Sequence, residues 1–98
     1  MRVLTGLFQP MEAETPYGGR SVTFEPLGAI WLKAGTRRRV ERGEGDRRRS
    51  VETMRAGTRA DPRLAVGRVL RFGGADWTIR LIAEPRPGRV ELELERTR

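Results

Sequence analysis

The sequence predicts an all-β domain, a small antiparallel barrel or sandwich of about six or seven short strands with one long arginine-rich insert loop. Three observations support this prediction. Apolar and polar residues alternate with a period of two in the C-terminal third, glycine and proline turns separate short apolar segments, and a long charged insert lies between segments of strand character. The 98 residues fit one domain over residues 1–98, with the insert loop at residues 35–50.

The C-terminal third predicts a three-stranded antiparallel meander over residues 67–96. In Arg89–Arg96 three aliphatic residues alternate with three glutamates, which places the aliphatic side chains on one face of a strand. Asp76–Ala83 alternates in the same way, and Gly67–Phe72 leads into Gly73-Gly74, a pair that favours a tight hairpin turn. We expect six side chains of the meander to share one core: Trp77, Ile79, Leu81, Val90, Leu92 and Leu94.

The N-terminal third predicts three further short strands. Val3–Gln9 forms a first strand, Ser21–Glu25 forms a strand that ends before a proline, and Leu27–Ala34 forms a strand with one buried face. Gly18-Gly19 predicts a turn and not a phosphate-binding loop, because it lacks the spacing of such a loop and no helix follows it. The side chains that this region should contribute to the core are Leu4, Leu7, Phe8 and Trp31.

The pattern after the insert allows two structures. Ser50–Arg55 fits either a strand or a one-turn helix capped by Ser50, and we favour the strand because the spacing is not that of a capping box. Ala56–Ala65 predicts a loop with a turn at Asp61-Pro62. The chain shows no internal repeat and no interdomain linker.

The insert Gly35–Ser50 is the strongest candidate for a functional surface. It holds seven arginines and three acidic residues, a net charge of +4 out of +7 for the whole chain. Two interpretations stay open: a mobile loop that contacts nucleic-acid phosphates or an acidic protein face, or a solvated loop enlarged by GC-rich codon usage. Base stacking by the loop is not expected, because no aromatic residue lies between Trp31 and Phe72. The candidate DNA-channel or subunit-interface residues are Arg37, Arg38, Arg39, Arg42, Arg47, Arg48 and Arg49.

The composition argues against enzymatic activity. The chain has no cysteine and no histidine, which removes thiolate nucleophiles, thiolate zinc sites and the usual general base. We therefore expect no catalytic residue, no cofactor and no metal site. No apolar run reaches the ~20 residues of a membrane-spanning helix. The apolar N-terminal stretch is also too short for a secretory signal, so we expect a protein without a membrane partner that stays where it is translated.

Three carboxylates, Glu91, Glu93 and Glu95, form a stripe on the polar face of the last predicted strand. Same-face residues on a strand stand roughly 7 Å apart. No other acidic cluster lies near them in the sequence, so a cation site is not expected. We expect a solvated face paired with Arg80 or Arg71, or an acidic face against which the insert of an adjacent copy docks.

The order of short motifs along the chain has a further implication. The segments that carry it are Tyr17-Gly18-Gly19, Thr23-Phe24, Ile30-Trp31, Thr53-Met54-Arg55, Gly67-Arg68-Val69 and Gly74–Ile79, with the charged insert in the middle. Over roughly residues 4–95 this order resembles the phage head–tail joining family, the head-closure or stopper proteins of long-tailed phages and phage-like gene transfer agents. The first strand is shorter, and the insert richer in arginine, than is usual in that family.

The resemblance implies a structural virion protein. Such a small β-barrel forms a six- or twelve-fold ring at the virion neck, between the portal/adaptor complex and the tail, where it closes the DNA-filled head and provides the tail docking surface. The implied partners are portal and adaptor ring proteins, tail terminator or tail tube proteins, other copies of the chain, and packaged DNA held without sequence preference in the channel. The neck of the particle would be assembled in the host cytoplasm. The alternatives are a small β-barrel nucleic-acid-binding module and another neck ring component such as a tail terminator.

Overall fold

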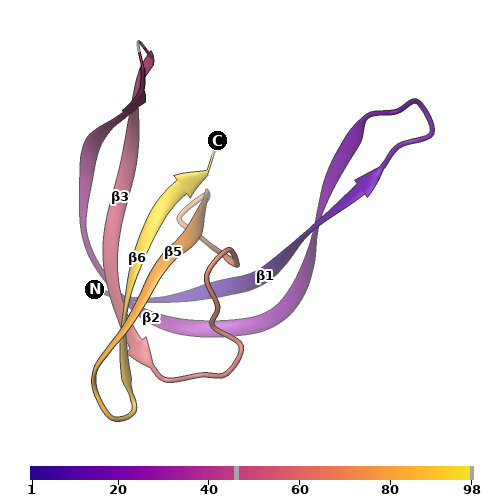
Figure 1. Ribbon diagram of the computed structural model, residues 1–98. Helices are drawn as coiled ribbons and strands as arrows, with labels where there is room; N and C mark the ends of the chain where they lie inside the picture. The colour runs from indigo at the N-terminus through magenta and orange to yellow at the C-terminus, as the bar shows by residue number, and fades with distance from the viewer. Residues whose placement is uncertain (46, 98) are drawn as a thin grey trace.

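The computed structural model describes residues 1–45 and 47–97, apart from the side chains of Glu44, Arg47 and Thr97, and shows an all-β protein (Figure 1). Six antiparallel strands close into a barrel in the order β1-β2-β3-β6-β5-β4, and β4 completes the ring by pairing with β1. The strands are β1 (Arg2–Glu14), β2 (Arg20–Glu44), β3 (Arg47–Arg59), β4 (Val69–Phe72), β5 (Ala75–Arg86) and β6 (Arg89–Thr97). The predicted small antiparallel barrel is confirmed. No helix that could cross a membrane occurs among the described residues.

One hydrophobic core fills the barrel, because inward-facing side chains alternate with outward-facing ones along each strand. Its largest fully buried side chain is Trp77, whose ring stacks on Phe72 with 6.0 Å between the ring centroids. All six strands contribute to this core. The buried hydrophobic residues are Leu7, Ile30, Leu32, Met54, Ala56, Val69, Leu70, Ala75, Trp77, Ile79, Val90, Leu92 and Leu94.

The C-terminal meander of β4, β5 and β6 is confirmed, but one of its six expected core residues is wrong. Leu81 is 55% exposed because a β-bulge lies between Ile79 and Leu81. Ile79 pairs with the buried Leu94, whereas Leu81 pairs with Glu93 on the outer face. The extra residue in the bulge reverses the alternation of side chains, so Leu81 points to solvent.

Two side chains expected in the core of the N-terminal half also lie outside it. Trp31 is 56% exposed and Leu4, its partner across the β1–β2 ladder, is 54% exposed. The inward positions beside them are occupied by other residues, among them Thr5 and Ile30. Thr5 is tolerated in the core because its hydroxyl donates a hydrogen bond to the Ile30 carbonyl at 2.8 Å.

The predicted insert loop at residues 35–50 is not a loop. Ser21–Glu25, Leu27–Ala34 and most of the insert form one continuous strand, the 25-residue β2. Residues 47–50 of the insert begin β3, and the β2 side of the ladder between the two strands runs from Lys33 to Glu44 with one register shift, between Ala34 and Arg37. Strand pairing satisfies the backbone of the paired residues, while the charged side chains that the structure describes lie exposed on the two faces of the hairpin.

The strand favoured for Ser50–Arg55 is confirmed, since it lies within β3. The loop expected over Ala56–Ala65 begins later than predicted, because residues 56–59 still pair with β6. The chain then crosses to β4 through residues 60–68, where Asp61 makes the predicted turn by accepting a backbone hydrogen bond from Leu64 at 3.0 Å.

Two hairpins extend beyond the closed barrel (Figure 1). Pairing between β1 and β4 is limited to Gly6–Phe8, so residues 9–25 form a two-stranded projection, the β1–β2 arm. Pairing between β3 and β6 begins at Thr53, the partner of Arg38, so the described residues of 39–52 form a second projection. Together with Arg37 and Arg38 at its base, we call it the arginine hairpin. The two projections give the protein an elongated shape of 46 × 34 × 24 Å.

Candidate functional site

The arginine hairpin separates its cations onto two faces, because successive side chains of a strand point in opposite directions. The cross-strand pairs Arg39 with Glu52, Glu41 with Ser50 and Gly43 with Arg48 set the register. One face therefore carries Arg37, Arg39 and Arg48, and the opposite face carries Arg38, Arg42 and Arg49. The side chain of Arg47 lies outside the described residues.

The first face of the hairpin interacts with the protein itself. The Arg37 guanidinium lies over the Trp77 ring, 5.5 Å from its centroid. Arg39 is 3.4 Å from a carboxylate oxygen of Glu52, which Arg96 contacts at the same distance. Arg48 is 3.9 Å from Glu41. Arg37 thus ties the hairpin to the barrel through Trp77, and Arg96 of β6 does so through Glu52, whereas Arg39 and Arg48 pair with acids of the hairpin itself.

The opposite face of the hairpin is less compensated. Arg42 is 3.6 Å from a carboxylate oxygen of Glu95, and Arg80 lies 3.5 Å from the same oxygen. Among the described residues, Arg38 and Arg49 have no acidic partner. On this face, Arg38 and Arg49 are the described cations that stay available to an external anion.

Within the glutamate stripe, Glu95 pairs with Arg80 as expected, whereas Glu91 lies 4.0 Å from Arg55. Arg71 instead makes a two-point contact with Asp76, at 2.7 Å and 3.2 Å, while its guanidinium lies 4.4 Å from the Phe8 ring centroid. The Asp76 carboxylate raises the pKa of Arg71 further above its already high value. The insert of the same chain reaches the stripe through Arg42 and Glu95.

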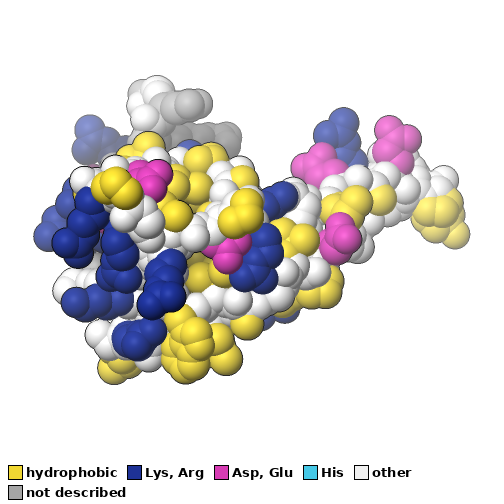
Figure 2. Space-filling view, turned by 90° about the horizontal axis from the view of Figure 1, so that it is seen from below, with side chains coloured by type: hydrophobic (Ala, Val, Ile, Leu, Met, Phe, Trp, Pro, Cys, Tyr) yellow, Lys and Arg dark blue, Asp and Glu magenta, His cyan; other side chains and the backbone are white. Residues whose placement is uncertain are grey.

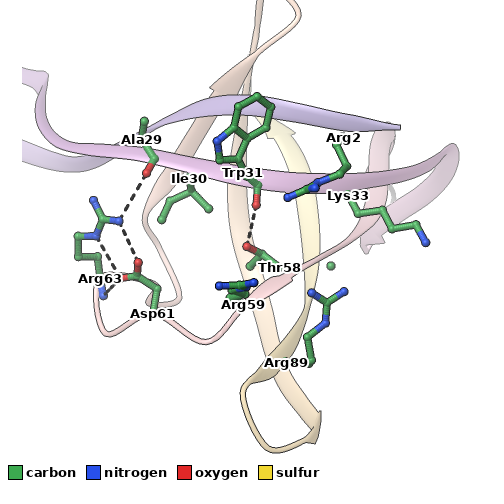
Figure 3. A pocket seen from close by; sticks show the side chains of 11 residues that line it. Arg2, Ala29, Ile30, Trp31, Lys33, Thr58, Arg59, Asp61, Arg63 and Arg89 are labelled. Atoms are coloured by element: carbon green, nitrogen blue, oxygen red, sulfur yellow. Dashed lines mark hydrogen bonds and ion pairs between the residues drawn. The ribbon is translucent and has the colours of Figure 1, made fainter.

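A second cationic region was not predicted from the sequence. A hollow of about 610 Å³ opens beside Trp31, and four cations from four different strands line it: Arg2, Lys33, Arg59 and Arg89 (Figure 3). We call it the basic hollow. Because its four cations are spread over the whole chain, no local run of charge in the sequence indicates it.

The floor of the basic hollow is fixed by side-chain hydrogen bonds (Figure 3). Thr58 donates to the Trp31 carbonyl at 2.7 Å, which holds the end of β3 against β2. Asp61 accepts from the Arg63 guanidinium at 2.8 Å, and Arg63 in turn donates to the Leu27 carbonyl at 3.0 Å. The hydrogen bonds from Arg63 hold the pKa of the Asp61 carboxyl below its usual range.

The basic hollow is consequently suited to an anion. Its one lining carboxylate, Asp61, is already neutralised by Arg63. The Arg2 guanidinium lies 5.9 Å from the Trp31 ring centroid, and none of the four cations has an acidic partner among the described residues. The described residues also contain no group of three acidic side chains that could hold a metal ion.

Comparison with known proteins gives a fold relationship. No family model and no curated protein matches the chain. A chain of the virion of a native gene transfer agent (GTA) particle has a similar structure, with a TM-score of 0.68, 18% sequence identity, and coverage of 97% of this chain and 94% of the other. The phage-like element PBSX protein xkdH from Bacillus subtilis also matches, with a TM-score of 0.55, 12% identity, and coverage of 98% and 96%. This chain therefore has the same fold as a chain of a gene transfer agent virion and as a protein of a phage-like element.

Proposed function

We propose that this protein is a structural component of the neck of a phage-like particle. It forms a six- or twelve-fold ring between the portal/adaptor complex and the tail, closes the DNA-filled head and provides the tail docking surface. The observation that carries the proposal is the match of nearly the whole fold to a chain of a gene transfer agent virion, 97% of this chain and 94% of the other. Because a fold alone does not determine a function, the surface chemistry supplies the second argument.

In the proposed ring, the arginine hairpin reaches the axial channel. Arg38 and Arg49 lie on the less compensated face of that hairpin and have no acidic partner among the described residues. A ring repeats this pair in every copy, which produces a cationic collar. Such a collar holds DNA through phosphates, so its contacts are sensitive to salt and indifferent to base sequence.

The proposal is tested by deleting the gene in a strain that produces the particles. We expect heads that package DNA but then lose it and never gain tails. Cryo-electron microscopy of wild-type particles should place the chain at the head–tail junction. Tailed, DNA-retaining particles from the deletion strain would refute the neck function. Density for the chain at the tail side of the junction, in contact with the tail tube and not with the adaptor, would assign it as a tail terminator.

A second candidate function is favoured by one observation in the basic hollow. Trp31 is 56% exposed and lies among four cations, the combination of stacking surface and charge that single-stranded nucleic acid binds. A free nucleic-acid-binding module would bind an oligonucleotide as a monomer, with quenching of Trp31 fluorescence and loss of binding at high salt. Because Trp77 is fully buried, Trp31→Phe supplies the control that assigns any quenching to the exposed ring.

A further inference from the structure

We propose that the β1–β2 arm of one copy docks in the basic hollow of the next copy, so that the proposed ring assembles through a head-to-tail contact. The inference rests on the ring assembly proposed above and specifies which two surfaces meet. Neither surface is explained by the barrel core or by the arginine hairpin.

The β1–β2 arm contacts the rest of its own chain only at its base among the described contacts, where Gln9 accepts a hydrogen bond from Arg68 at 2.8 Å and Arg71 lies 5.6 Å from the Phe24 ring centroid. A two-stranded hairpin that stands alone in water is marginally stable, so an arm of this length needs a surface to pack on. Its tip residue Tyr17 is 98% exposed, and two apolar side chains along it, Met11 and Val22, are about half exposed, at 49% and 52%. Exposed aromatic and apolar side chains on a projection are typical of interface anchors.

Charge selects the basic hollow as the site that receives the arm. Residues 9–25 contain three glutamates and one arginine, a net charge of −2 within a chain of net charge +7. Glu14 makes no ion pair among the described residues, and Glu12 contacts only Arg20, at 3.4 Å with both side chains mostly exposed. The hollow offers four cations without acidic partners. Opposite charge on the two surfaces favours their association and fixes its register.

The direction of the arm favours a partner in another molecule. Figure 2 shows the arm projecting from one end of the protein, while Lys and Arg side chains gather on the barrel at the other end. The arm leads away from the barrel that carries the hollow, and contact between these two different surfaces of two copies is heterologous, so it closes into a ring when the rotation permits. The volume of about 610 Å³ is large enough to accept the tip side chain of the arm together with its carboxylates.

The test uses the absence of native cysteine, which gives engineered thiols no background. Tyr17→Cys at the arm tip and Ala29→Cys in the hollow are placed in separate chains, mixed, and treated with a short bis-maleimide. We expect a cross-linked heterodimer, and a ladder of higher multimers when both cysteines are in one chain. The control pairs Tyr17→Cys with Val66→Cys, whose site is 62% exposed and lies outside the hollow.

Charge reversal shows whether the cross-link depends on electrostatic attraction between the arm and the hollow, which cross-linking by random collision of two molecules would not. Glu12→Lys/Glu14→Lys in the arm, or Arg59→Glu/Arg89→Glu in the hollow, should each lower the cross-linking yield by at least about tenfold, because like charges then meet. Mixing the reversed arm with the reversed hollow should restore the yield. All four positions are exposed, and circular dichroism of each variant checks that the barrel is intact.

The outcomes separate this inference from the proposed function. Cross-linking no greater than that of the Val66→Cys control overturns the arm contact, and if native mass spectrometry still finds a closed ring, the ring assembly itself stands. An efficient cross-link in a protein that is absent from the particle neck supports the contact and refutes the neck role. Binding of single-stranded DNA that Arg59→Glu/Arg89→Glu abolishes, without any cross-link, assigns the hollow to nucleic acid and overturns the inference.

Discussion

Truncation of Leu92 and of Leu81 to alanine should have very different effects on stability, although both residues belong to alternating apolar patterns in the sequence. Leu92 is fully buried in β6, between Ala56 of β3 and Ile82 of β5. Leu81 lies on the outer face of β5, beyond the β-bulge, and is 55% exposed. The pair is a matched test of the register of the barrel.

The magnitude follows from burial. Full burial of a leucine side chain stabilises a protein by about 1.5–3 kcal/mol, and the cavity that truncation leaves raises the loss to about 2–5 kcal/mol. A domain of this size has about 5–15 kcal/mol of total stability. Since each kcal/mol lowers the Tm of a small domain by about 4–8 °C, Leu92→Ala should lower Tm by roughly 10–30 °C. Leu81→Ala leaves no cavity in the core, because Leu81 lies on the outer face, and should change stability by less than about 0.5 kcal/mol.

The assay is urea denaturation followed by circular dichroism, with thermal melts of the same samples. An unchanged m-value in both variants shows that the difference lies in the folded state. Equal losses for the two variants, or a larger loss for Leu81→Ala, would show that β5 has no bulge at this position and that the strand register is wrong.

Three further predictions address the surface and the turns. Arg38→Ser/Arg49→Ser should reduce DNA retention in particles that still assemble, and normal retention by this double variant would refute the phosphate contact. Arg37→Ser should instead destabilise the isolated protein, because Arg37 lies on Trp77. Asp61→Asn should destabilise the protein near neutral pH. Since Arg63 lowers the pKa of Asp61, the difference from wild type should disappear as pH falls below about 4 and through the lower folded-state pKa, as denaturation at several pH values will show. Gly28→Ala should cost about 1–3 kcal/mol, because Gly28 has a φ of 121° and an added Cβ would collide with the Arg63 guanidinium; Gly57→Ala, with its nearest neighbour at 4.0 Å, is the control in the same denaturation series.

The strands that the sequence predicts correctly are those with one face buried in the core and the other exposed to solvent. The meander of β4, β5 and β6 follows directly from alternation and from the Gly73-Gly74 turn, both of whose glycines have positive φ. A β-bulge, by contrast, leaves no local signature in composition. It reverses the alternation at one residue, so the exposure of Leu81 depended on pairing with β6 that sequence reasoning cannot see.

The candidate site was predictable in part for a similar reason. A run of arginines reports charge but not whether its backbone pairs with another strand, so the insert was expected as a loop although it continues β2 and β3. The basic hollow was missed because Arg2, Lys33, Arg59 and Arg89 come together only when the barrel closes. The exposure of Trp31 could have been predicted from period-two alternation, because its neighbours Ile30 and Leu32 both lie on the buried face of the strand.

The arginines of this chain fall into two groups: those that make contacts within the fold and those that have no partner in it. Some arginines make contacts within the chain. Arg37 and Arg71 lie on aromatic rings, and Arg63 donates hydrogen bonds to backbone carbonyls of β2. Codon usage that favours arginine is compatible with such sites, because the planar guanidinium stacks on rings and donates to several carbonyls at once. The arginines without partners are different, since isolated cations repel one another and add nothing to folding. Among the described residues, arginines of this kind include Arg38 and Arg49 at the arginine hairpin and Arg59 and Arg89 at the basic hollow. Contacts outside the chain are where the charge of these two regions can act.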